Sequence, residues 1–197
     1  MKNAFILFVF TLLFACNNNI QDGITRDIPR NIGGSYDIFY LLAKDKQKQL
    51  GLDSLENGFR DLQIRIWYDH SLVKDRKLII ISNKDSSWTA TIYDMQVDWD
   101  GVSEKITSKK IREASPKSGW PAFSKSLLDQ HILTLPTQDD VEGYSAGDDG
   151  TTYNVEVATK NSYRFYSYWE PQGYKDRFPE ARNISAILEL LESEFNY

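Results

Sequence analysis

The chain has 197 residues and a formal net charge of −5, from 23 basic and 28 acidic residues. This length suits one domain behind a short leader, and it is enough for that domain to bury its own core. Acidic and basic residues are interspersed and no basic block occurs, so we expect no nucleic-acid partner.

The first fifteen residues have the pattern of an export signal. Lys2 precedes an apolar run from Ala4 to Ala15 that only Thr11 interrupts. A positive residue followed by a short apolar stretch is typical of a signal peptide. The run is too short to span a bilayer, which takes about 20 apolar residues. Residues 1–15 are therefore predicted to be a signal peptide.

The apolar run ends in Leu13-Phe14-Ala15-Cys16, which resembles the lipobox of Gram-negative-type bacterial lipoproteins. In that family the chain is cut before the cysteine, and the thiol and the new amino terminus are acylated. The resemblance implies lipid attachment at Cys16 and a membrane as a partner. Two alternatives stay open: an ordinary cleaved leader with a chance cysteine, and an uncleaved anchor helix.

Cys16 is the only cysteine of the chain, so the body has no disulfide, thiol nucleophile or thiolate metal ligand. Asn17 follows it, where an aspartate would resemble an inner-membrane retention signal, and no acidic run comes next. We therefore expect an anchor in the outer membrane, facing the periplasm. Residues 16–34 are predicted to be a flexible tether, and residues 35–197 a single globular domain.

The first half of the domain predicts one helix and then a meander. Ser35 is the expected cap of a helix that runs to Leu50 and is followed by Gly51, although the same stretch also fits a strand. Apolar residues then alternate or run together in segments typical of strands; these are residues 61–69, 77–82, 87–99 and 104–113. Short connections between them favour antiparallel pairing.

The second half predicts a helix, a hairpin and a final helix. Pro121 suits the first turn of a helix within residues 115–136, and residues 151–169 alternate as two strands. Apolar residues recur every three or four positions from Pro179 to about Phe195. The expected fold is α+β: an antiparallel sheet, made of the meander and the C-terminal hairpin, with the helices packed on one face, the C-terminal helix included.

The hairpin register supplies the candidate binding face. A three-residue turn at 160–162 places Tyr163 and Phe165 on the core side with Val157. The opposite side, together with the neighbouring strand, then carries an aromatic and charged surface of the kind used in binding; its members are Arg65, Trp67, Glu156, Arg164, Tyr166 and Tyr168. The alternative is that these aromatic residues belong to a thick core.

Three patterns suggest chemistry, and each is weak. Residues 143–147 match G-x-S-x-G, but a polar loop surrounds them and both histidines precede Ser145, unlike the order in serine hydrolases. Asp148-Asp149-Gly150 lacks the spacing of a calcium loop. His70 and His131 are too far apart for a metal motif. We expect no catalytic residue, metal site or cofactor.

Three longer stretches, "GFRDLQIRIWYDHSLV", "SPKSGWPAFSKSLL" and "DGTTYNVEVATKNSYRFYSYWEP", resemble uncharacterised bacterial lipoproteins. That family brings no known activity. The sequence favours a non-enzymatic envelope lipoprotein that binds a protein or peptide. The alternatives are a structural envelope component and a hydrolase that uses carboxylates. The hydrolase requires two carboxylates in one pocket, and the candidates are Asp148, Asp149, Glu156 and Glu170.

Overall fold

The computed structural model describes residues 23–101 and 103–197. Cys16, the predicted signal peptide and the first part of the predicted tether lie outside these residues. In the part described, no helix is both long and apolar enough to cross a bilayer. The elements are β1 (Thr25–Asp27), α1 (Ile38–Leu50), η1 (Leu55–Asn57), β2 (Leu62–His70), β3 (Asp75–Lys84), β4 (Ser87–Trp99), β5 (Glu104–Ala114), α2 (Trp120–Asp129), η2 (Gln138–Asp140), β6 (Thr151–Thr159), β7 (Ser162–Trp169), α3 (Pro171–Tyr174) and α4 (Pro179–Phe195).

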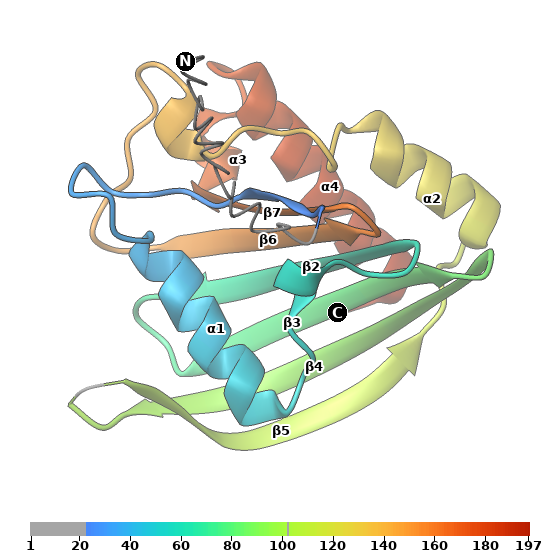
Figure 1. Cartoon of the computed structure of the whole chain (residues 1–197), viewed down its shortest axis with the longest axis horizontal. Coiled ribbons are helices and arrows are strands. Elements are labelled where there is room, and N and C mark those ends of the chain that lie inside the picture. Colours follow the sequence, from blue (N-terminus) through green and yellow to red (C-terminus); the bar gives the residue numbers. More distant parts are fainter. Residues whose placement is uncertain (1–22, 102) are drawn as a thin grey trace, which may run out of the picture.

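One sheet organises the domain (Figure 1). Its strand order is β1-β7-β6-β2-β3-β4-β5, and every neighbouring pair except β1 and β7 is antiparallel. Strands β2 to β5 are the predicted meander, and β6 and β7 are the predicted hairpin. The hairpin joins the meander because β6 pairs with β2. The predicted α+β class with an antiparallel sheet is confirmed.

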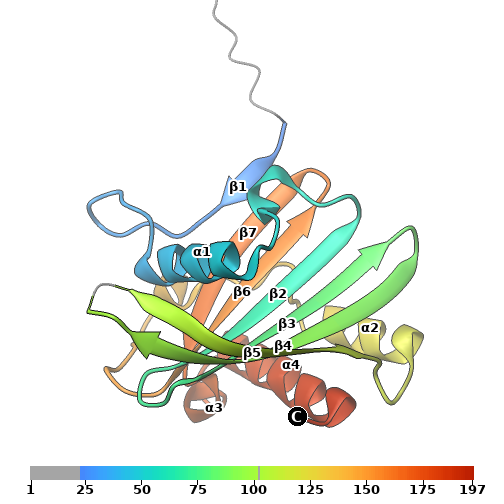
Figure 2. The same cartoon turned by 90° about the horizontal axis from the view of Figure 1, so that it is seen from below.

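Helices cover both faces of this sheet, so the prediction of a single covered face is wrong (Figure 2). Helix α1 packs on one face with Trp67 and Phe165, whereas α2 and α4 pack on the other with Ile66 and Val155. The sequence of β3 explains the two layers, because four successive apolar residues, Leu78 to Ile81, are all buried. Alternate side chains point to opposite faces, so each face of a strand like this needs cover.

Helix α1 begins two residues later than predicted. Asp37, not Ser35, is the cap, and its carboxylate accepts hydrogen bonds from the backbone N–H groups of Phe39 and Tyr40. Gly51 ends the helix as predicted, with a positive φ of 69° that glycine adopts without strain.

The predicted tether is wrong in its second half. Thr25–Asp27 forms β1, which pairs in parallel with β7, and the Thr25 N–H donates to the carbonyl of Asn161 at 3.0 Å. Asp27 also pairs with Arg164 at 2.8 Å. Strand hydrogen bonds and an ion pair therefore attach residues 25–27 to the domain, although composition predicted that they belong to a flexible tether.

The hairpin uses the shorter of the two turns that its sequence permits. Val157 lies opposite Arg164, and Glu156 lies opposite Phe165, so only Lys160 and Asn161 form the turn. The predicted three-residue turn is wrong by one residue. A shift of one residue in a strand pair exchanges which side chains share a face, and the consequences fall on the candidate binding face.

Candidate functional site

Half of the predicted binding face lies beneath α1. Arg65, Trp67 and Glu156 are each at most 3% exposed. The Glu156 carboxylate accepts hydrogen bonds from Trp67 Nε1 at 3.0 Å and from the Tyr163 hydroxyl at 2.8 Å, and it lies 4.0 Å from Arg65 Nη1. Burial raises the pKa of Tyr163, and the adjacent Glu156 raises it further. These residues form a buried polar network in the core, in which Arg65 Nη1 makes no hydrogen bond.

The other half lies on the opposite face of the sheet and anchors a neighbouring segment. Tyr166 and Tyr168 are fully buried, and their hydroxyls donate to the carbonyls of Ile132 and Pro136. Arg164 donates to two further carbonyls of the same segment, those of Leu133 and Leu135. The six predicted residues are split between two faces; five are buried, and the Arg164 side chain is 23% exposed. The predicted exposed face does not exist, and these aromatic residues belong to the core.

The structure instead brings four charged residues together at the end of the sheet where β2 meets β3. Lys46 from α1 binds Asp69 of β2 and lies 3.6 Å from Glu104 of β5. Arg76 of β3 binds the same Glu104 and lies 3.6 Å from Asp69. Asn154 donates to the second oxygen of Asp69. We call these four charged side chains the quartet. They connect α1 to three strands, and positive and negative charges alternate around the quartet.

The quartet forms the floor of a cavity of about 170 Å³, which we call the charged pocket. Apolar and aromatic side chains form part of its wall, from Phe39, Leu42 and Trp169. His70 and Asp148 also line it. Burial lowers the pKa of His70, and the nearby Arg76 guanidinium lowers it further. A charged floor below aromatic walls combines a site for a polar group with a surface for an apolar one.

A well-anchored loop, residues 145–150, closes one side of the charged pocket. Trp169 Nε1 donates to the carbonyl of Asp149, and the Gly150 N–H donates to the Ser71 hydroxyl. A Cβ at Gly147 would lie 2.7 Å from the Trp169 ring, so only glycine permits this approach. This explains Gly147 of the G-x-S-x-G match by packing, whereas Gly143 has a positive φ of 81°. Ser145 lies in this loop, and its carbonyl accepts a hydrogen bond from Tyr174.

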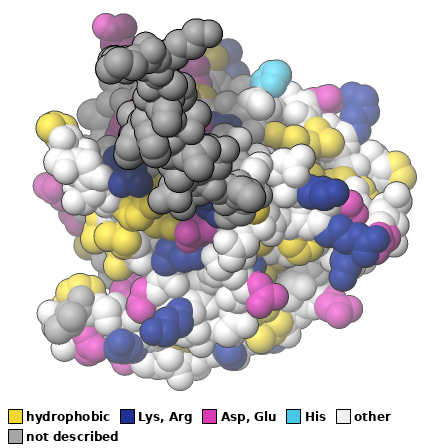
Figure 3. Space-filling view, in the orientation of Figure 1, with side chains coloured by type: hydrophobic (Ala, Val, Ile, Leu, Met, Phe, Trp, Pro, Cys, Tyr) yellow, Lys and Arg dark blue, Asp and Glu magenta, His cyan; other side chains and the backbone are white. Residues whose placement is uncertain are grey.

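Several exposed apolar side chains neighbour the charged pocket in the chain or in the sheet. We call them the apolar rim; its members are Ile38, Leu41, Leu72, Val73 and Trp99. Each is close in the chain or in the sheet to a residue of the pocket wall, and Trp99 pairs directly with Glu104. In Figure 3, hydrophobic side chains gather over the first turns of α1, and smaller hydrophobic groups lie among the basic and acidic side chains on the rest of this face. A cluster of exposed apolar groups marks an interaction site more often than isolated ones do.

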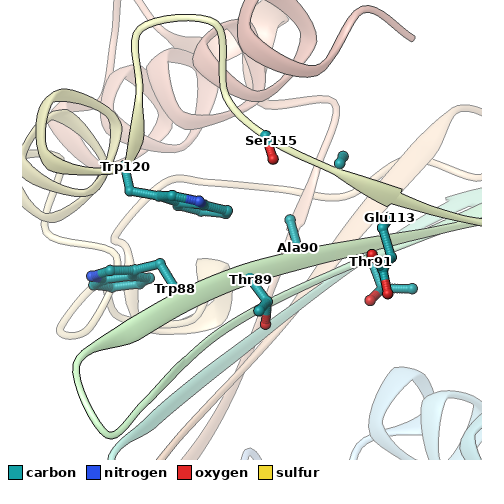
Figure 4. Close-up of a pocket in the computed structure, with 8 residues that line it drawn as sticks. Trp88, Thr89, Ala90, Thr91, Glu113, Ser115 and Trp120 are labelled. Carbon is teal, nitrogen blue, oxygen red and sulfur yellow. The ribbon is translucent and has the colours of Figure 1, made fainter.

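A second concavity, of about 340 Å³, lies at the opposite end of the sheet (Figure 4). Here the first residues of β4 extend beyond the last residue of β5. The indole rings of Trp88 and Trp120 stack at one end of this tryptophan groove, 6.2 Å apart between centroids. Thr91 and Glu113 lie at its other end. This groove is open and shallow, and its lining holds no buried charge.

Of the four candidate carboxylates of the hydrolase interpretation, which requires two in one pocket, only Asp148 lines the charged pocket. Glu156 is enclosed beneath α1, and Glu170 bonds the backbone N–H of Thr151. Across residues 23–101 and 103–197, no group of three or more histidine, cysteine or acidic side chains is placed to hold a metal ion. No family model and no curated protein matches the chain.

No pattern in the sequence predicts the quartet. Its members come from four elements, and no motif joins them. One signal was present: Lys46 lies in α1 between the buried positions Ala43 and Gln47. A lysine on the buried side of a helix needs a carboxylate partner, because a lone buried charge is costly. That rule predicts a partner without saying which carboxylate it is.

Proposed function

We propose that the protein is a lipid-anchored envelope protein that binds a protein or peptide partner through the charged pocket and its apolar rim. The observation that carries this proposal is the apolar rim itself. Leu72 is 75% exposed and follows Ser71 of the pocket lining, and Trp99 is 63% exposed and pairs in the sheet with Glu104 of the charged floor. Protein interfaces usually have aromatic and apolar contacts at their centre and polar residues around them.

The position of the N-terminal strand favours this surface over the tryptophan groove. Thr25 bonds the β6–β7 turn, which lies at the end of the sheet opposite the β2–β3 turn with Leu72 and Val73. Strand β2 joins these two ends and is about 30 Å long at the usual rise per residue. From Cys16 to Thr25 an extended chain reaches at most about 30 Å. A lipid at Cys16 would therefore keep the β6–β7 turn within reach of the membrane, whereas the rim lies at the other end of the sheet.

Site-specific photocrosslinking in cells tests the proposal. A photoreactive phenylalanine analogue replaces Leu72 in one variant and Trp99 in another, both on the rim. The matched control is Leu128, an exposed leucine of α2 that is 38% exposed and lies outside the pocket. We expect a discrete adduct of protein or peptide mass from both rim positions and none from position 128. Absence of a rim adduct, or the same adduct from position 128, contradicts the proposal.

A charge substitution gives an independent check. Leu72→Asp together with Val73→Asp places two charges on the rim without touching the core, so the melting temperature should change little. The adduct formed at position 99 should then fall sharply, because charged groups disfavour an apolar contact. An unchanged adduct in this variant would show that the rim does not contribute to binding.

A further inference from the structure

The quartet does not present its four charges equally to the pocket. The side chains of Lys46 and Arg76 are 2% and 8% exposed, whereas those of Asp69 and Glu104 are 14% and 16% exposed. The two cations lie deeper, and the two carboxylates are the more accessible members. A group that enters the pocket therefore meets carboxylate oxygens first.

Asp148 adds a third carboxylate to the wall. Among the described residues it makes no hydrogen bond and no ion pair, and it is exposed. With His70 neutral, the lining carries three negative charges and two positive ones. The pocket therefore has a net negative charge that its own residues do not compensate, and a cation entering it gains from this imbalance.

The remaining wall suits the stem of a basic side chain. Phe39 and Leu42 offer apolar surface, and Trp169 offers an aromatic ring that is fixed in place by the Asp149 carbonyl. Long basic side chains bury their methylene stems against apolar surface and hold the charged head in a polar place. Aromatic rings also attract such cations. A volume of about 170 Å³ has room for one side chain of this kind.

We propose that the charged pocket binds the lysine or arginine side chain of a partner peptide in which apolar residues flank the basic one. The basic head pairs with Asp148 and the accessible oxygens of Asp69 and Glu104. The flanking apolar residues lie on the rim, against Leu72 and Trp99. This inference rests on the proposed binding function and adds the chemistry of the partner.

Selection from a peptide library tests this partner chemistry. The full acylated chain in detergent is applied to an immobilised library of short random peptides, and bound sequences are read out. We expect enrichment of one lysine or arginine between apolar residues. In the best peptide, exchange of that basic residue for norleucine removes the charge and keeps the stem, and should weaken binding about tenfold.

Asp148→Asn tests the wall carboxylate in the same assay and should weaken the basic peptide about fivefold while leaving the norleucine peptide unchanged. The matched control is Asp176→Asn, which changes the net charge equally at an exposed position outside the pocket. Selected peptides without a basic preference, or equal binding of the norleucine peptide, overturn this inference and leave the proposed function standing. A library that yields no binder also overturns it; if the rim crosslinks are absent as well, the proposed function falls with it.

Discussion

At the scale of single residues, the most consequential group is the carboxylate of Glu156. It is 1% exposed and is the nearest negative charge to the buried guanidinium of Arg65, whose pKa is lowered by burial and raised in part by Glu156. Arg65 is also bound by the side chain of Gln63 and the carbonyl of Asp53. Those neutral partners satisfy donors but do not compensate the charge, so Glu156 holds the network together.

Glu156→Ala should therefore destabilise the fold strongly. Removing one member of a buried ion pair leaves an uncompensated charge, which costs about 3–5 kcal/mol. Glu113→Ala is the matched control, because Glu113 is exposed at the edge of the sheet and should cost less than about 0.5 kcal/mol. Urea unfolding measures both changes. Similar losses from the two substitutions would mean that the Glu156 network does not stabilise the fold.

His70 gives the stability a pH dependence with a defined sign. Burial lowers its folded pKa from the ordinary value of 6.5, and Arg76 lowers it further, against smaller effects of Asp69 and Asp75. As the pH falls below 6.5, the unfolded chain takes up this proton before the folded one, so stability decreases. Urea midpoints at pH 7.5 and 5.5 should differ more for the wild type than for His70→Gln. An equal change in both proteins would exclude this contribution of His70.

At the scale of elements, the periodicity of the sequence predicted where strands and helices lie but not how they face one another. Strands β2 to β5 match the segments in which apolar residues alternate or run together, because both patterns are local. The face of β7 depends on one residue of turn length, which "TKNS" leaves open. The position of α1 depends on Lys46 meeting carboxylates from distant strands, and β1 depends on the free edge of β7. These three features come from tertiary pairing, and local sequence does not encode them.

The β3–β4 turn offers a test of an element whose local sequence and backbone disagree. Asp85 and Ser86 form a two-residue turn with φ values of 52° and 64°. Positive φ at both central residues is typical of a type I′ turn, and such turns favour glycine at the second central residue. Ser86→Gly should therefore stabilise the fold by about 0.5–1 kcal/mol, since serine is strained in this conformation.

Ser87→Gly is the control for this turn. Ser87 is the first residue of β4 and has no positive φ, so glycine there gains nothing and costs about 0.5–1 kcal/mol in chain entropy. Opposite signs in urea unfolding support the assigned turn. If both substitutions destabilise the protein, the positive φ at Ser86 carries no strain.

At the scale of the whole molecule, the sheet gives the protein two unlike ends. One end carries the N-terminal strand, the β6–β7 turn and the tryptophan groove, and the other carries the charged pocket and the apolar rim. Exposed apolar residues at a turn also suit insertion into a lipid surface. The proposed lipid at Cys16 distinguishes the two uses of the rim, because a lipid there would restrain the first end near the membrane and leave the second free.

Fluorescence quenching by lipids with brominated acyl chains measures which end lies near the bilayer. Fluorophores are attached to a cysteine at position 160, in the β6–β7 turn, or at position 72, on the rim, in the acylated protein reconstituted into vesicles. We expect stronger quenching at position 160, since the covalent reach from Cys16 to Thr25 of about 30 Å keeps that turn close to the lipid. With Cys16→Ser, quenching at position 160 should be lost and the protein should no longer sediment with the vesicles. Stronger quenching at position 72 would place the rim in the membrane, and the rim would then bind lipid and not a protein partner.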